Sequence, residues 1–212
     1  MRAIFAFLTM ILSVAAGAET AAGAAPYQAG VHYQELTTPV TTSNPDKIEV
    51  TEVFWYGCGH CFQFEPLVSQ WAAKQPADVN FVKSPAMWNS LMENHARAFY
   101  AAKAMGVLDK VSQPLFNALN VENKRLQDAD EVAELFAQHG VDQAEFLKVF
   151  KSFGVTSQVR LADANARGYG ITGTPEMVVD GRYRISASMA GGQAQMLNVV
   201  DYLVAKLRAE RN

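Results

Sequence analysis

The sequence predicts an α/β protein in which helices cover both faces of a sheet and an all-helical block interrupts it. Short runs rich in β-branched residues occur near both ends of the chain, and an almost unbroken helical pattern lies between them. The chain has 212 residues, half of them hydrophobic, which is enough for one large core or one domain with an insertion. Lys and Arg number 18 against 21 Asp and Glu, without a basic run, so no nucleic-acid partner is expected.

The first residues have the pattern of a secretory signal peptide. Arg2 precedes an apolar run that ends in small residues at 16–18. This run is shorter than the roughly 20 residues of a membrane-spanning helix, so an uncleaved anchor is the less favoured alternative. We expect a signal over residues 1–18, with cleavage as late as residue 25, and an exported mature protein.

Strands are predicted where β-branched and aromatic residues gather. An edge strand is expected near residues 33–36, a central strand over 47–56 and another strand over 79–83. The stretch from Gly59 onward carries apolar side chains at helical spacing, which predicts a helix after the central strand. Late in the chain, Asp180-Gly181 lies between two short extended runs and predicts a hairpin turn.

Residues 87–168 predict helices only. Five helical stretches follow one another, each bounded by Gly, Pro or an Asp or Ser cap, and a closing helix is expected over 193–209. The predicted organisation has four parts. They are the signal over 1–18, a first α/β part over 26–84, a helical insertion over 85–169 and a second α/β part over 170–212.

The only two cysteines, Cys58 and Cys61, lie at the corner between the predicted central strand and the helix that follows. Export places them in an oxidising compartment, where a structural disulfide is the simplest alternative. A ring of four residues would contribute only about 2 kcal/mol, against about 4.7 kcal/mol for a loop of a hundred residues. Zinc is not expected because a second pair of soft ligands is lacking. The spacing therefore favours a redox-active disulfide that needs no cofactor and no metal.

The position of Cys58 before a helix predicts an acidic thiol. Backbone N–H groups at a helix start and the positive end of the helix dipole both favour the thiolate. We expect Cys58 to be the exposed sulfur that exchanges with substrate thiols, and Cys61, one turn inside, to be covered and to act as the resolving thiol. Only the reduced pair carries the thiolate, so a low pKa favours the dithiol and makes the disulfide an oxidant.

Two neighbouring side chains could tune this pair. His60 lies between the cysteines and would add positive charge when protonated, although it could also be an exposed turn histidine without influence. Strand alternation places Glu52 on the side of Val50 and Phe54. Burial there would raise the pKa of Glu52 and suit it as a proton acceptor for Cys61, whereas the alternative is a carboxylate at a strand edge in water.

The motif Cys58-Gly59-His60-Cys61, with Pro66 after it, resembles the active site of the thioredoxin superfamily. Gly-His between the cysteines is typical of protein disulfide isomerases. The stretches EVFWYGC, CFQFEP and TGTPEMVVDGRY, together with the helical insertion, make nearly all of the mature sequence similar to the DsbA family of periplasmic thiol:disulfide oxidoreductases. The resemblance implies a thioredoxin-like fold with an inserted helical subdomain.

The resemblance also implies a substrate site and partners. Thr174-Pro175 is similar to the cis-proline loop that faces the cysteines in this superfamily and can pair with a substrate strand. The implied clients are reduced or unfolded secreted polypeptides, and a membrane quinone-linked reoxidase of the DsbB type is the implied partner of a monomer. Gly59 departs from the Pro-His usual in DsbA proteins, which leaves a reductase or isomerase as an alternative. A metal-carrying or peptide-binding module is the alternative from another class.

Overall fold

The computed structural model describes residues 26–211, and the predicted signal peptide lies outside them. The described strands form one mixed sheet in the order β1-β5-β4-β2-β3, in which only β2 and β3 are parallel neighbours. The strands are β1 (Gln34–Glu35), β2 (Ile48–Phe54), β3 (Val79–Pro85), β4 (Glu176–Val179) and β5 (Tyr183–Ser186). Every residue of β2 is buried, which confirms the predicted central strand.

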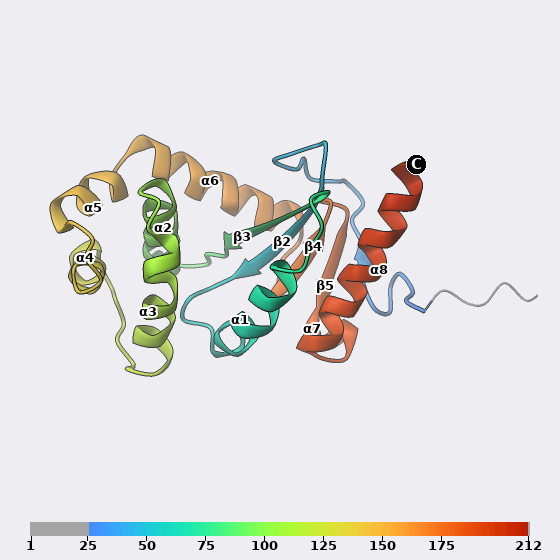
Figure 1. Cartoon of the computed structure of the whole chain (residues 1–212), viewed down its shortest axis with the longest axis horizontal. Helices are drawn as coiled ribbons and strands as arrows, with labels where there is room; N and C mark the ends of the chain where they lie inside the picture. The colour runs from blue at the N-terminus through green and yellow to red at the C-terminus, as the bar shows by residue number, and fades with distance from the viewer. Residues whose placement is uncertain (1–25, 212) are drawn as a thin grey trace, which may run out of the picture.

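Five consecutive helices connect β3 to β4. They are α2 (Ser90–Ala104), α3 (Leu108–Asn120), α4 (Ala129–Ala137), α5 (Gln143–Phe150) and α6 (Phe153–Gly168). Figure 1 shows α2 to α5 gathered at one end of the molecule and α6 running back to the sheet. The predicted α/β class with an inserted helical block is confirmed.

Helices cover both faces of the sheet. On one face, α1 (Gly59–Ala72) and α8 (Gln193–Arg211) pack on strand residues such as Val50 and Met177. On the other face, Val53 and Val178 pack against Met92 of α2 and Tyr169, which follows α6. The structure adds a helix that the sequence did not predict, α7 (Ala187–Ala190), because four residues are too few for a periodic pattern.

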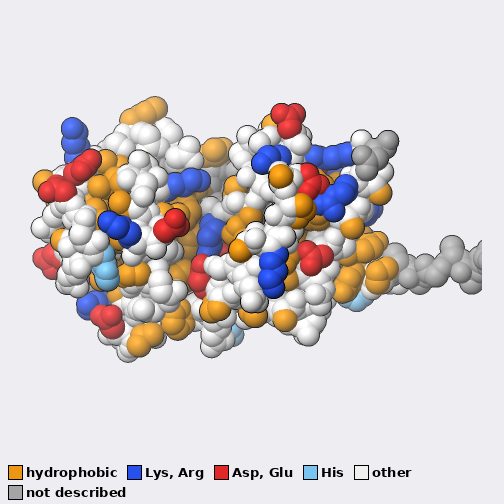
Figure 2. Space-filling model, viewed as in Figure 1, with side chains coloured by type: hydrophobic (Ala, Val, Ile, Leu, Met, Phe, Trp, Pro, Cys, Tyr) orange, Lys and Arg blue, Asp and Glu red, His pale blue; other side chains and the backbone are white. Residues whose placement is uncertain are grey.

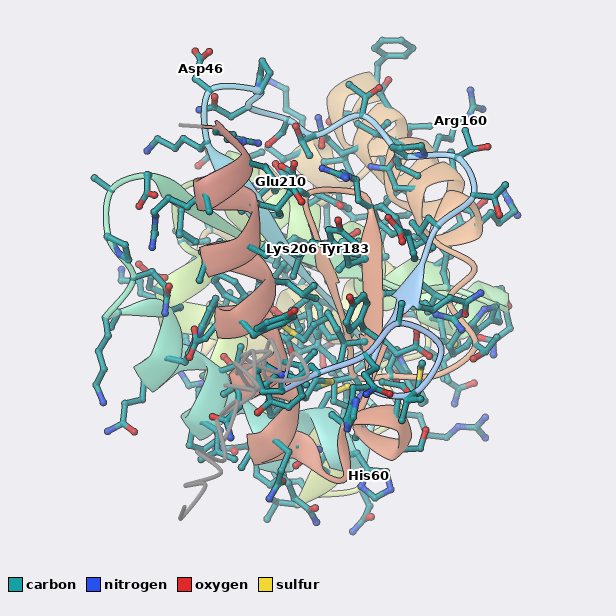
Figure 3. All side chains as sticks on the ribbon, turned by 90° about the vertical axis from the view of Figure 1, so that its right-hand side faces the viewer. Asp46, His60, Arg160, Tyr183, Lys206 and Glu210 are labelled. Atoms are coloured by element: carbon teal, nitrogen blue, oxygen red, sulfur yellow. The ribbon has the colours of Figure 1, made fainter. Side chains whose placement is uncertain are left out.

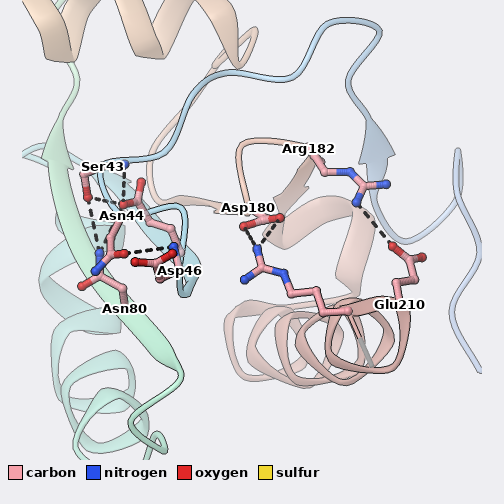
Figure 4. Close-up of polar contacts among 9 residues, drawn as sticks. Ser43, Asn44, Asp46, Asn80, Asp180, Arg182 and Glu210 are labelled. Carbon is pink, nitrogen blue, oxygen red and sulfur yellow. Dashed lines mark hydrogen bonds and ion pairs between the residues drawn. The ribbon is translucent and has the colours of Figure 1, made fainter.

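The hairpin turn is present as predicted, because Asp180 and Gly181 both have positive φ, 55° and 62°. Figure 4 shows this turn tied to the end of α8, where Arg211 donates hydrogen bonds to Asp180 and Arg182 donates one to Glu210. Figure 2 shows acidic and basic side chains interspersed over the face in view. Within the described residues, no helix is both long and apolar enough to cross a bilayer.

Candidate active site

Cys58 caps the N-terminus of α1 with its sulfur. Its backbone is extended, with φ −89° and ψ 113°, and the N–H of Cys61 donates to Cys58 Sγ over 3.4 Å. The sulfur thus takes the place of the side-chain oxygen at an ordinary N-cap. Both cysteines are free thiols, so the structure shows the reduced pair. Cys61 is fully buried, as predicted, whereas Cys58 is half-buried rather than fully exposed.

The two thiols differ sharply in acidity. Hydrogen bonds lower the pKa of Cys58 from 9.0 to about 5, first from the Cys61 thiol, then from the Thr174 side chain and from the backbone N–H groups of Cys61 and His60, against the opposing effect of burial. The pKa of Cys61 is raised, first by burial and then by the proton that it shares with Cys58. The reduced pair therefore holds its negative charge on the accessible sulfur.

The loop opposite the cysteines contains a cis Thr174–Pro175 peptide bond, as the resemblance implied. Cys58 Sγ lies 3.3 Å from the carbonyl oxygen of Thr174, to which the protonated thiol donates. Pro175 is buried and Thr174 is partly exposed. The structure therefore brings residues 58 and 174, far apart in sequence, into direct contact.

The imidazole of His60 is exposed. Figure 3 shows it at the edge of the molecule, close to α7. The carbonyl of His60 accepts a hydrogen bond of 2.7 Å from the side chain of Gln193, and its backbone N–H is among the groups that lower the pKa of Cys58. This residue thus contributes its main chain to the corner, and the effect expected of its charged ring stays a prediction.

Glu52 is completely buried beneath the corner, as alternation predicted. Burial raises its pKa to about 7, although Lys83 opposes this, and the charge of Cys58 is among the groups that raise it further. Lys83 Nζ lies 3.2 Å from Glu52 Oε2, contacts Glu65 of α1 and faces the ring of Phe54 at 5.0 Å. The sequence interpretation missed Lys83 and Glu65.

The segment just before Cys58 is fixed by the helical insertion. A Cβ at Gly57 would come within 2.4 Å of the Trp55 ring, so glycine permits this close approach. The Trp55 indole donates to Nδ1 of buried His95 over 3.0 Å, and Asn120 donates to the carbonyl of Tyr56 over 2.7 Å. The sequence interpretation did not single out His95 or Asn120, because nothing near them in the sequence points to the cysteines.

These features define a class of protein. A mixed sheet delivers an acidic cysteine to a helix start, a second cysteine lies buried one turn further on, and a cis-proline loop lies against the first sulfur. This is the arrangement of a thiol:disulfide oxidoreductase with a thioredoxin-like fold. Among the described residues, no cluster of His, Cys, Asp or Glu has the geometry to hold a metal ion.

Comparison with known proteins gives the family. Residues 68–204 match the DSBA-like thioredoxin domain. The chain is 43% identical over 202 residues to the thiol:disulfide interchange protein DsbA of Pseudomonas aeruginosa, covering 95% of this chain and 96% of the relative. It is 45% identical over 180 residues to DsbA of Azotobacter vinelandii, covering 85% and 84%.

Solved structures agree with the sequence comparison. The crystal structure of Pseudomonas aeruginosa DsbA superposes with a TM-score of 0.85 at 43% identity, covering 87% of this chain and 96% of that chain. DsbA from Xylella fastidiosa gives a TM-score of 0.81 at 31% identity, covering 86% and 98%. The chain therefore belongs to the DsbA family and acts as a thiol:disulfide oxidoreductase.

Proposed function

We propose that the protein is an exported oxidase that donates the Cys58–Cys61 disulfide to reduced secreted polypeptides. The observation that carries the proposal is the pKa of about 5 at the accessible Cys58. At neutral pH the reduced protein holds this sulfur as a stabilised thiolate, so the equilibrium of exchange favours passing the disulfide to a client.

The reaction proceeds through a mixed disulfide. A client thiolate attacks Cys58 Sγ of the ring, an S–S bond to the client forms, and Cys61 leaves as a thiolate that takes up a proton because its pKa is raised. A second client thiolate then attacks the client sulfur of the mixed disulfide, closes the client's own bond and releases the Cys58 thiolate. The two electrons of the client dithiol now reside on the reduced cysteine pair.

The surrounding residues receive their proposed roles from this sequence of steps. Glu52, with a pKa of about 7, can give and accept the proton of Cys61 at neutral pH. Thr174 and Pro175 form the edge against which the client strand lies, and Gly59 and His60 complete the loop around Cys58. No group beyond the redox-active disulfide is needed for the exchange.

The setting of the reaction follows from the family and the sequence pattern. We propose removal of residues 1–18 and a periplasmic monomer, in which the helical insertion over 85–169 interrupts a thioredoxin-like domain made of 26–84 and 170–212. The proposed partner that removes the electrons is a membrane quinone-linked reoxidase of the DsbB type. No nucleic acid takes part.

Replacing the attacked sulfur tests the proposal directly. Cys58→Ser is expected to abolish oxidation of a reduced, unfolded test protein, measured as recovery of its native disulfides, because a hydroxyl cannot form the mixed disulfide. Cys61→Ser, offered a client that already carries a disulfide, is expected to trap a mixed disulfide at Cys58, seen as a reducible increase in mass. The Cys58 thiolate attacks one client sulfur, the other client sulfur leaves as a thiolate, and no second thiol in the variant resolves the new bond. Full oxidase activity in Cys58→Ser would refute the proposal.

A disulfide isomerase or reductase is the second candidate function, and Gly59 is the observation that favours it. Gly59 is the first residue of α1, where proline is favoured, and a Cβ there would meet only Asn120 Oδ1, at 4.0 Å. Packing therefore does not require glycine between the thiols. A motif that departs from Pro-His without steric need can shift the potential away from that of a strong oxidant.

Equilibration with glutathione separates the two candidates. We expect a potential less negative than about −200 mV, as for an oxidant, whereas a value near the −270 mV of thioredoxin would indicate a reductase. Gly59→Pro is expected to raise the potential by about 30 mV, because a rigid first turn holds the N–H groups of His60 and Cys61 toward the thiolate. An unchanged or lower potential in Gly59→Pro would contradict this account of position 59.

A further inference from the structure

Glu176 comes directly after the cis-proline loop, and its carboxylate is buried beside that loop. Its side chain is only 4% exposed. Oε1 accepts hydrogen bonds from the backbone N–H of Gly173, over 3.1 Å, and from the hydroxyl of Thr172, over 3.3 Å. One carboxylate oxygen therefore holds two consecutive residues of the loop.

Arg184 contacts both Glu176 and the beginning of the same loop. It comes from β5 and places its Nε 3.6 Å from Glu176 Oε2, while its Nη1 donates to the carbonyl of Gly170 and its Nη2 to Gln34 of β1, over 2.7 Å. The ion pair thus connects the loop, from Gly170 to Gly173, to the strands beneath it. Both residues also line a cavity of about 490 Å³ together with His60 and Pro175.

Burying the Glu176–Arg184 ion pair costs free energy. Burial raises the pKa of Glu176, and among the described residues neither Glu176 Oε2 nor Arg184 Nε has a hydrogen-bond partner. Buried ion pairs often contribute less to stability than apolar residues of similar volume. The buried carboxylate of Glu176 is therefore better explained by a role in fixing the geometry of the loop than by a role in stability.

We propose that Glu176 is a positioning residue for the exchange reaction, which holds Thr172 and Gly173 so that Thr174 keeps its place against Cys58. The inference rests on the proposed function, because it assigns importance to the contact of 3.3 Å between Thr174 and Cys58 Sγ. That contact is with the Thr174 carbonyl, which accepts from the protonated thiol, whereas the Thr174 side chain is the group whose hydrogen bond lowers the pKa of Cys58. Releasing the loop would therefore withdraw the side-chain hydrogen bond of Thr174 and make Cys58 less acidic. It would also leave the edge on which the client lies in a less defined position.

Three substitutions at Glu176 separate the effect of side-chain length from the effect of side-chain charge. Glu176→Asp keeps the charge but withdraws the oxygen by one methylene from Gly173, Glu176→Gln keeps an oxygen at the right reach without the charge, and Glu176→Ala removes both. The control is Asp180→Asn at the other end of β4, which removes an equal charge from the ion pair with Arg211 (Figure 4). The readouts are the thiolate absorbance of the reduced protein as a function of pH, and KM and kcat for oxidation of a reduced dithiol peptide.

Glu176→Asp and Glu176→Ala are expected to raise the midpoint of the Cys58 titration by about one pH unit, because the thiolate loses the hydrogen bond of the Thr174 side chain. At a given pH below the midpoint, this shift is a tenfold loss of thiolate. KM is expected to rise several-fold with a smaller change in kcat. Glu176→Gln and Asp180→Asn are expected to keep the midpoint within about 0.3 pH unit of the unmodified protein. A purely structural residue would lower thermal stability without moving the midpoint.

Two results would overturn the inference. One is an unchanged midpoint and KM in folded Glu176→Asp, which remains informative if Glu176→Ala fails to fold. The other is a shift in Glu176→Gln as large as in Glu176→Asp, which would show that an oxygen at the right reach is not what holds the loop. Loss of oxidase activity in the unmodified protein would count against the proposed function alone, because the titration midpoints do not depend on it.

Discussion

The Cys58 thiolate is expected to contribute about 3 kcal/mol to the unfolding free energy of the reduced protein at pH 7, and nothing well below pH 5. The folded pKa is lowered from 9.0 to about 5, so the contribution is lost as the pH falls through 5 and is complete only above 9, at about 5 kcal/mol. The oxidised protein has no thiol and should lack this dependence. Urea unfolding of both redox forms between pH 4 and 9 measures the difference.

The same energy sets the strength of the oxidant. A preference of about 3 kcal/mol for the dithiol makes the potential about 60 mV less negative at pH 7 than that of a pair with ordinary acidity. Reduced Cys58→Ser is the matched control, because it keeps the fold and the N-cap but carries no thiolate. Parallel pH profiles for the reduced protein and for this variant, or a thiolate midpoint near pH 9, would contradict the expectation.

Lys83→Met is expected to destabilise the protein by about 3–5 kcal/mol at pH 7 to 8, because it leaves two carboxylates beneath the active corner without their shared cation. The loss of Lys83 raises the pKa of Glu52 still further and keeps it protonated in the variant, so the deficit should shrink as the pH falls below about 7, where the unmodified protein also holds Glu52 protonated. Chemical denaturation at pH 4.5 and pH 8 checks both the size and the sign.

Two comparisons make the Lys83 experiment specific. Lys124→Met breaks an ion pair with Glu122 whose side chains are both almost half exposed, and it should cost less than about 1 kcal/mol. The double variant Lys83→Met/Glu52→Gln should recover part of the stability, because the fully buried carboxylate is gone. An equal loss in Lys83→Met and Lys124→Met would show that the buried cation has no special importance.

Local signals were sufficient for most of the fold. β-branched runs located β2 and β3, caps and periodicity located the five inserted helices, and Asp180-Gly181 located the hairpin because its positive φ values suit such a pair. The same reasoning could not find α7, which is a single turn capped by Ser186. Its existence depends on a local hydrogen bond and on packing rather than on a repeating pattern.

The site was predictable only where one stretch of chain determines it. Cys58 and its helix are adjacent in sequence, so the acidity of the sulfur followed from local physics. Lys83 reaches Glu52 because the two residues are direct partners across the parallel strands, and Glu176 reaches Arg184 across a hairpin. The register between strands depends on the whole packed core, so these contacts between strands could not be predicted from a single sequence.

Because Cys61 is completely buried, Cys58 is the only cysteine that a client can reach. Every client trapped by the Cys61→Ser variant would be joined by one disulfide to the same atom, Cys58 Sγ. A pull-down with this variant followed by reductive elution would therefore yield a catalogue of clients in which each member was held by one defined linkage.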